Sequence, residues 1–412
     1  MAQINITLNQ EEILQLLSKN SDDAFRKLLT ESLNSVLKAE SQEQLKATPY
    51  ERTEERQDSR NGYRERSLNT RIGTITLKVP RHRNQPFKTM IFENYLRSEA
   101  SLIAAMVEMV VDGVSTRKVS DVVETLCGTK ISKSAVSELC KDLDEKVDAF
   151  RNRPLTGSYP FLTADASYFK VRENHRIISK ALMIAFGVNE QGIREVIGFN
   201  TYRNESAETW TDFLRSLKDR GLSGVLVITS DAHEGIINAK TKVFPEVAWQ
   251  RCQFHFSKNI CDKAPKKFQA GLHAELQEMF GASTIESARK KRDSIINDYR
   301  DVAEAVMDCL DEGFESSMTT IIFSKHLYHH FRTANHIERL NRELKCRSKV
   351  IGIFPNEASL IRLMGSVLME EHEKRQGATR IFRPEKYKEI LASTIPDELK
   401  CIAEEQQILR IA

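Results

Sequence analysis

The segment FLTADASYFKV, residues 161–171, opens the part of the chain that decides the fold. Two further strand-like segments follow it closely, RIISKALMIAFGV at 176–188 and IREVIGF at 193–199. The connections between the three segments are short, and Glu190-Gln191-Gly192 has the composition of a turn. We therefore expect three antiparallel strands that are neighbours in one sheet.

Helices and strands are expected to alternate after this meander. Residues 206–220 carry apolar side chains at helical spacing. Short apolar strands are predicted at 225–229 and 247–250, with a helix between them. This order of elements is that of a ribonuclease-H-like α/β core, which we place over residues 158–256.

The chain beyond this core is predicted to be helical. Residues 257–330 carry apolar stripes at helical spacing, and we interpret them as an all-helical insertion into the core. Residues 331–365 then bring a helix back to the core, and residues 366–412 form a helical tail.

The region before the core is mostly helical and divides into three segments. Residues 1–50 are predicted to be helical, residues 51–98 to contain a linker and a β-hairpin, and residues 99–152 to form two helices. The second of these two helices should begin after the capping residue Ser132 and run past Val147 with one apolar face. The pair has the outline of a helix-turn-helix, but an ordinary helical hairpin gives the same pattern.

Basic residues are concentrated in the predicted hairpin. Residues 60–90 hold eight Lys and Arg residues and one acidic residue, whereas the whole chain has a formal net charge of +3. We expect arginines on the outer face of the hairpin to contact DNA phosphates, although a solvated charged face is the alternative. The predicted DNA contacts of this region are Arg60, Arg64, Arg66, Arg71, Lys78, Arg81 and Arg83, with Lys133 in the following helix pair.

Composition argues against several other classes of protein. The seven cysteines are odd in number and lack CxxC pairs, which indicates a reducing compartment and not a disulfide framework. The N-terminus lacks the pattern of a signal peptide, and no apolar run is long enough to span a bilayer. We therefore expect a soluble cytoplasmic protein without a membrane partner.

Three acidic residues stand in contexts that can bring them together. Asp165 lies on the first strand, Asp231 follows the strand at 225–229, and Glu338 lies in the helix after the insertion. A lone Asp after a strand is commonly a helix cap, but three carboxylates in such positions favour a metal site. Mg²⁺ prefers oxygen ligands, and two divalent ions held by the three residues would suit phosphodiester chemistry.

The helix that carries Glu338 is predicted to be amphipathic. Ile337, Leu340 and Leu344 form its inner side, so its polar side can line an active site along DNA. On this helix we expect Asn335, Arg339 and Asn341 to support the active site, and Arg342 and Lys345 to contact DNA.

Cys252 and His255 form a CxxH pair. A structural zinc ion needs four ligands, and the partners of a CxxC or HxxxH motif are missing. Support of the active site is therefore favoured over zinc binding, and a purely structural role for both residues stays open.

Two segments resemble the signature of the Mutator-type bacterial insertion-sequence transposases, namely TANHIERLNRE at 333–343 and VIGIFPN at 350–356. The segments SDAH at 230–233 and WQRCQFH at 249–255 are similar to that family as well. The resemblance implies a DDE transposase whose triad is Asp165, Asp231 and Glu338.

The same resemblance implies the cofactors and partners. Two Mg²⁺ or Mn²⁺ ions would bind at the triad, which would cut the ends of the insertion sequence and transfer the 3′-OH strand to target DNA. The partners would be double-stranded DNA, as terminal inverted repeats and target, and further copies of the chain in a dimer or larger synaptic complex, in the nucleoid of a prokaryote. The alternatives are a catalytically silent DNA-binding regulator and a nuclease without strand transfer.

Overall fold

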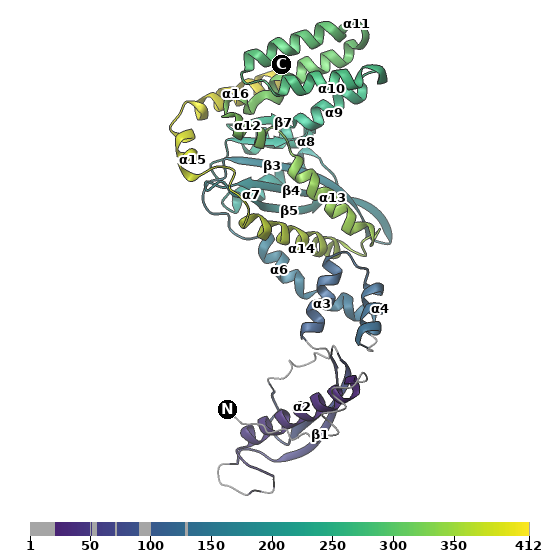
Figure 1. The fold of residues 1–412 in the computed structure, drawn as a ribbon. Coiled ribbons are helices and arrows are strands. Elements are labelled where there is room, and N and C mark those ends of the chain that lie inside the picture. Colours follow the sequence, from purple (N-terminus) through teal and green to yellow (C-terminus); the bar gives the residue numbers. More distant parts are fainter. Residues whose placement is uncertain are drawn as a thin grey trace. The chain divides into compact units, whose positions relative to one another are not determined.

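The computed structural model describes residues 21–49, 51, 56–70, 72–89, 100–127 and 131–411. Two compact units make up the chain, residues 1–141 and residues 142–412 (Figure 1). Arg71, one of the predicted DNA contacts, lies outside the described residues.

The first part of the smaller unit is a helix packed on a β-hairpin. Helix α2 (Ser21–Leu45) lies against strand β2 (Gly73–His82), which pairs with β1 (Arg60–Thr70). Buried and exposed residues alternate along most of β2, because α2 covers one face of the hairpin. The predicted segments 1–50 and 51–98 therefore share one core, which consists of Leu37, Leu68, Ile75, Leu77 and Val79.

The register places two of the hairpin arginines, Arg64 and Arg66, on the inner face and not on the expected outer face, although Arg64 is solvent-exposed there. Arg64 pairs with Val79 and Arg66 pairs with Leu77, and residues directly opposite in an antiparallel pair share a face. Val79 and Leu77 are buried, so both arginines lie on the face that packs against α2. Lys78 points from the opposite face. A run of charges does not reveal the register, and a shift of one residue moves a side chain to the other face.

Three short helices follow in the smaller unit. They are α3 (Ala100–Val111), α4 (Thr116–Cys127) and α5 (Lys133–Leu139), and they share a small core. Ser132 caps α5, as predicted, because its hydroxyl accepts a hydrogen bond from the N–H of Ala135 (3.2 Å).

The prediction of one long helix after Ser132 is wrong. Helix α5 ends at Leu139, and a separate helix, α6 (Asp142–Arg151), begins the larger unit. Val136 of α5 packs in the core of the small helices, whereas Val147 of α6 packs in a core of the larger unit. Apolar spacing is the same in both halves and does not show that they are buried in different places.

A five-stranded mixed sheet forms the centre of the larger unit, with the strand order β5-β4-β3-β6-β7. The three strands of the predicted meander are antiparallel neighbours, and β6 and β7 run parallel to β3. The α/β class and the meander are therefore confirmed. The strands are β3 (Phe161–Glu173), β4 (Arg176–Val188), β5 (Arg194–Tyr202), β6 (Val227–Ser230) and β7 (Ala248–Arg251).

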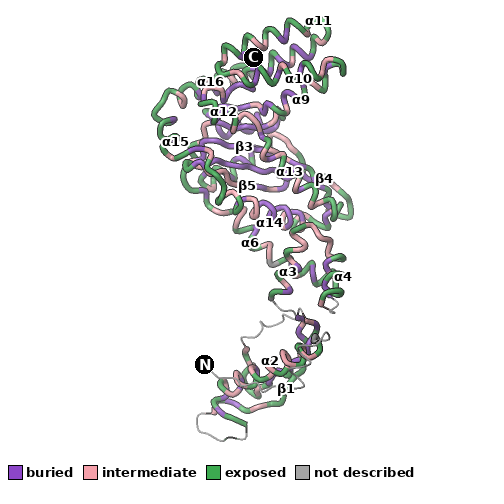
Figure 2. The backbone as a smooth tube through the Cα atoms, in the orientation of Figure 1, coloured by how far each residue is buried: buried purple, intermediate pink, exposed green. Residues whose placement is uncertain are grey.

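Helices cover both faces of this sheet. Alternate residues of β4 explain this arrangement: Met183 and Ala185 pack with α7 (Ala207–Asp219) and α8 (Glu234–Val243), whereas Ile184 packs on the other face. On that other face lie α6, α13 (Asn335–Lys349) and α14 (Glu357–Gln376). A strand that is buried on both sides is apolar along its length, as Figure 2 shows for the central strands.

Helices fill the sequence between β7 and α13, as predicted. They are α9 (Gln253–Lys263), α10 (Lys266–Phe280), α11 (Ile285–Met318), the 3₁₀ turn η1 (Thr319–Ile322) and α12 (Lys325–Phe331). These elements have a hydrophobic core of their own. Helices α15 (Pro384–Leu391) and α16 (Ile395–Ile411) close the chain.

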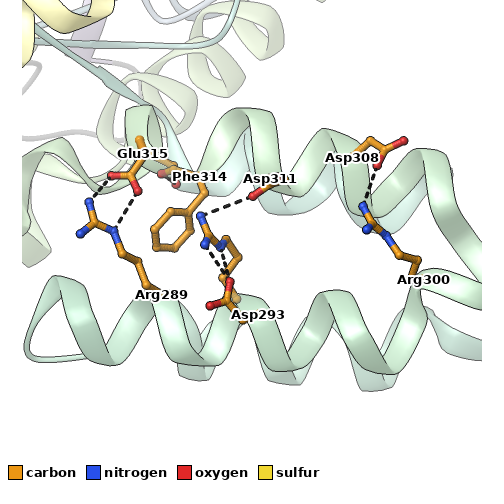
Figure 3. A network of polar contacts seen from close by, with 9 residues as sticks. Arg289, Asp293, Arg300, Asp308, Asp311, Phe314 and Glu315 are labelled. Carbon is orange, nitrogen blue, oxygen red and sulfur yellow. Dashed lines mark hydrogen bonds and ion pairs between the residues drawn. The ribbon is translucent and has the colours of Figure 1, made fainter.

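Helix α11 is bent back on itself at Ala303, whose backbone is not helical (φ −154°, ψ 50°). Ion pairs join the two limbs side by side (Figure 3). These pairs are Arg289–Glu315 (3.0 Å), Arg292–Asp311 (3.4 Å) and Arg300–Asp308 (3.2 Å). Most of these side chains are about half exposed, so the apolar core between the limbs contributes most of their stability.

Candidate active site

Strand pairing brings Asp165 and Asp231 to the same level of the sheet. Strands β3 and β6 are parallel neighbours, and the last residues that pair between them are Thr163 and Thr229. Asp165 lies two residues further along β3, and Asp231 directly follows the end of β6. Neighbouring strands lie roughly 4.8 Å apart, so the two carboxylates leave the sheet side by side.

Two hydrogen bonds bring the chain back to this point after the helical insertion. The hydroxyl of Thr229 on β6 donates to the carbonyl of Phe331 (2.8 Å). The backbone N–H of Gln253, just after β7, donates to the carbonyl of Arg332 (3.0 Å). Helix α13 starts three residues later, and its first turn carries Glu338.

Asn341 connects this helix to Asp165. Its side chain is only 7% exposed, and its amide nitrogen Nδ2 donates to Oδ2 of Asp165 (2.7 Å). The other carboxylate oxygen of Asp165 accepts the N–H of Ala166 (2.8 Å). Oδ1 of Asn341 and Oε1 of Glu338 are buried without a hydrogen-bond partner among the described residues. Buried oxygens normally have a partner, so these two indicate a place for a cation or a donor.

Burial raises the pKa of Asp165 to about 7. The negative charges of Asp231, Glu205 and Glu338 add to this increase, while the hydrogen bond from Ala166 opposes it. Ionisation of Asp165 is therefore unfavourable in the folded protein. A bound cation would make it more favourable.

Glu205 is a fourth acidic residue at this site, and the sequence analysis missed it. Burial raises the pKa of Glu205, the imidazole of His233 lowers it, and the charge of Asp231 raises it again. Its backbone carbonyl lies against the start of α8, where a Cβ atom on Gly235 would come within 2.7 Å of it. Glu205 lies in a polar loop before α7, where no pattern distinguishes it from a solvated residue.

Cys252 immediately precedes α9 and His255 lies in the first turn of that helix, beside Glu338. Cys252 is fully buried, and its sulfur accepts the N–H of Ala334, the residue that precedes α13 (3.3 Å). Burial raises the pKa of the Cys252 thiol to about 11. Nε2 of His255 lies 3.5 Å from Oε1 of Glu338. The structure thus brings both members of the CxxH pair to the predicted site.

Comparisons with known proteins identify the family. Residues 1–378 match the family described as "Transposase, Mutator family". The chain belongs to this family. The transposase for insertion sequence element IS256 in transposon Tn4001 of Staphylococcus aureus is 44% identical to this transposase over 378 residues, which is 91% of this chain and 97% of that protein. The resemblance predicted from the sequence is confirmed.

More distant relatives span a similar share of this transposase. The transposase for IS1081 of Mycobacterium tuberculosis is 38% identical over 89% of this chain and 89% of its own length. The transposase for ISRM5 of Rhizobium meliloti is 37% identical over 88% of this chain and 91% of its own length.

The other predicted site residues of the transposase are mostly exposed. Arg60 is an exception, because its guanidinium donates to the carbonyls of Ala47 (2.6 Å) and Thr48 (3.0 Å) and so holds a turn. In the part of the chain that the structure describes, no helix is long and apolar enough to cross a membrane. The exposed residues are Asn335, Arg339, Arg342 and Lys345 on α13, and Arg64, Lys78, Arg81, Arg83 and Lys133 in the smaller unit.

Proposed function

We propose that this transposase cuts and joins DNA at an active site formed by Asp165, Asp231 and Glu338 on a ribonuclease-H-like core. The register of β3 and β6 carries the proposal, because it sets Asp231 level with Asp165. The strand order and the mixed strand directions support the proposed core. Helix α13 adds Glu338 from one face of the sheet.

The side chains present fit a hard divalent cation. The three carboxylates and the unpaired Oδ1 of Asn341 are oxygen donors, which Mg²⁺ and Mn²⁺ prefer. Asp165, Asp231 and Glu338 would hold two such ions, which when bound supply activation of the attacking oxygen and relief of charge on the leaving oxygen. The ligand atoms of the three carboxylates do not all lie within 4.8 Å of one another. A single ion bound by all three would need that proximity, whereas two ions that divide the carboxylates between them would not.

The residues of the chain fix the geometry before any DNA arrives. Asn341 and Ala166 each donate to one oxygen of Asp165, so this carboxylate is held in one orientation. Arg342 and Lys345 are exposed one to two turns beyond Glu338 and are suited to contact the phosphates on either side of the scissile bond.

We assign recognition of the element ends to the smaller unit, through the exposed basic residues of the hairpin. Their contacts would be with phosphates, so end binding should weaken steeply as salt increases. Two ends must be held together for joining, and a dimer or larger complex of the chain would do this.

The variant Asp231→Asn tests the proposed active site. We expect it to lose cleavage and strand transfer on labelled element ends while it still binds those ends in a mobility-shift assay. The matched control is Asp219→Asn, at an exposed aspartate of α7. Cleavage by Asp231→Asn at the wild-type rate would refute the assignment, and cleavage without joining by the wild type would indicate a nuclease.

A further inference from the structure

A second group of possible ligands lies next to the proposed catalytic carboxylates. One ligand atom each of Cys252, His255 and Glu338 lies within 4.8 Å of the other two. Among the described residues, no other three His, Cys, Asp or Glu side chains form such a group. The three come from the starts of two helices, α9 and α13, that meet at the ends of β6 and β7.

Two polar atoms of this group lack hydrogen-bond partners. Nδ1 of His255 and Oε1 of Glu338 are both buried without a hydrogen bond to any described residue. Nε2 of His255 lies 3.5 Å from Oε1 of Glu338, which leaves that oxygen without a hydrogen bond. An unsatisfied carboxylate oxygen beside a buried sulfur and an imidazole is costly in a protein interior, and a bound cation would satisfy it.

The donor set selects the kind of cation. Thiolate, imidazole and carboxylate are the protein ligands of Zn²⁺, and three of them leave a fourth position for water. Mg²⁺ avoids sulfur and prefers oxygen, so it competes poorly for Cys252. Zinc needs only these three ligands if water completes its shell, which removes the objection that a CxxH pair alone is too few.

We propose that Cys252, His255 and Glu338 form a binding site for a thiophilic divalent cation, with Zn²⁺ as the chemical type. Binding forms a bond from the sulfur of Cys252 to the cation and releases the thiol proton to solvent. Glu338 is shared between this site and the proposed catalytic site. Occupancy of the thiophilic site therefore withdraws Glu338 from Asp165 and Asp231 and inhibits cleavage, a consequence that rests on the proposed function.

The sulfur of Cys252 lies at the N-termini of two helices, α9 and α13. The N–H of Ala334 donates to the sulfur of Cys252, and Cys252 itself precedes the first turn of α9. Its backbone N–H donates to the carbonyl of Ser230 (2.8 Å), which fixes the residue at the end of the sheet. The N–H groups of these two helix N-termini favour the thiolate and partly offset the burial that raises the pKa of the Cys252 thiol, and a bound cation would stabilise the thiolate further.

Cobalt tests the site directly in the full-length protein. Co²⁺ replaces Zn²⁺ and gives a sulfur-to-metal charge-transfer absorption only when a thiolate is a ligand. We expect this absorption in the wild type and in Cys261→Ser, a control at the cysteine within α9, and its loss in Cys252→Ser. Zn²⁺ should abolish it, and excess Mg²⁺ should not. Absence of the absorption in the wild type, or its persistence in Cys252→Ser, would overturn the proposal.

Two further variants distinguish loss of metal binding from misfolding and from failure of the proposed function. His255→Gln should retain the fold by circular dichroism and weaken Co²⁺ binding about tenfold or more; unchanged affinity would contradict the ligand set. Asp165→Asn should retain the absorption even though it cannot cleave, so the binding result stands apart from catalysis.

Inhibition is measured for each protein as its cleavage rate with Zn²⁺ divided by its rate without Zn²⁺. Equal ratios for the wild type and Cys252→Ser would overturn the sharing of Glu338.

Discussion

The amide of Asn341 donates a hydrogen bond to the carboxylate of Asp165 across 176 residues of sequence. This contact joins the first strand of the sheet to the helix that returns after the insertion. Glu338 lies one turn before Asn341 on that helix, so the contact also sets the distance of Glu338 from the sheet. One amide therefore holds Asp165 and fixes the part of α13 that carries Glu338.

Replacement of Asn341 by leucine should reduce DNA cleavage by roughly 10- to 100-fold with little change in DNA binding. The leucine fills the same space but leaves Oδ2 of Asp165 without its donor. Single-turnover cleavage of labelled ends measures the effect. The control is Asn297→Leu, at an exposed asparagine of α11, and an equal loss in both variants would contradict the role of Asn341.

Asp165→Asn should stabilise the protein in the absence of metal at neutral pH, by on the order of a few kcal/mol. The raised pKa of about 7 means that the folded state binds a proton more tightly than the unfolded state does. Ionisation therefore costs stability progressively as the pH rises from about 4 to 7, and the cost is full above that range.

Thermal unfolding in a chelator across this pH range tests the stabilisation. The difference between Asp165→Asn and the wild type should vanish below about pH 4, where the carboxyl is protonated in both states. A difference that does not depend on pH would show that ionisation of Asp165 is not its cause.

Glu205→Gln should increase the Mg²⁺ concentration needed for half-maximal cleavage, by roughly tenfold. Glu205 contributes negative charge to the surroundings of Asp165, and that charge attracts a cation. A titration of cleavage against Mg²⁺ measures the change. Glu208→Gln alters an exposed residue of α7 and serves as the control. An unchanged requirement in Glu205→Gln would place Glu205 outside the site.

Asp58→Asn should loosen the open end of the hairpin in the smaller unit, where the segment before β1 meets the segment after β2. Asp58 accepts the backbone N–H groups of Ser59 (2.6 Å), Asn84 (2.9 Å) and Gln85 (2.9 Å), and these bonds lower its pKa to about 2. The stability that Asp58 contributes is therefore full above about pH 4 and is lost as the pH falls towards 2.

Hydrogen exchange of the full-length protein, read by mass spectrometry, measures this loosening. Peptides that cover residues 59–85 should exchange faster in Asp58→Asn than in the wild type at neutral pH. Asp121→Asn, at an exposed aspartate of α4, is the control. Equal exchange in the wild type and Asp58→Asn would show that the carboxylate does not hold the loop.

The sequence predicted those features that depend on short-range patterns. Continuous apolar runs marked β4 and β6, and Glu190-Gln191-Gly192 marked the turn between β4 and β5, because burial on two faces and turn geometry leave local signatures. Helix α13 was predicted with its buried face, since Ile337, Leu340 and Leu344 repeat at helical spacing.

Features that depend on pairing between distant segments were not predictable in this way. The placement of Arg64 and Arg66 required the hairpin register, and the break between α5 and α6 required knowledge of two separate cores. Glu205 reaches the site through a loop whose path no periodicity describes. Asn341 was expected to support the active site, but its burial against Asp165 depends on how α13 packs on the sheet, which spacing along the helix does not reveal.

The hydrogen bond between Gln253 and Arg332 closes the helical insertion at its base. The chain leaves the sheet and returns to it at adjacent points, and the helices between have their own core. The two ends of the insertion are therefore held together at the sheet. The bend at Ala303 is part of this insertion, whereas Ser317 and Thr319 bond to β7. We therefore expect that extra residues at Ala303 would leave Glu338 in place, which makes this bend a point for grafting a new domain.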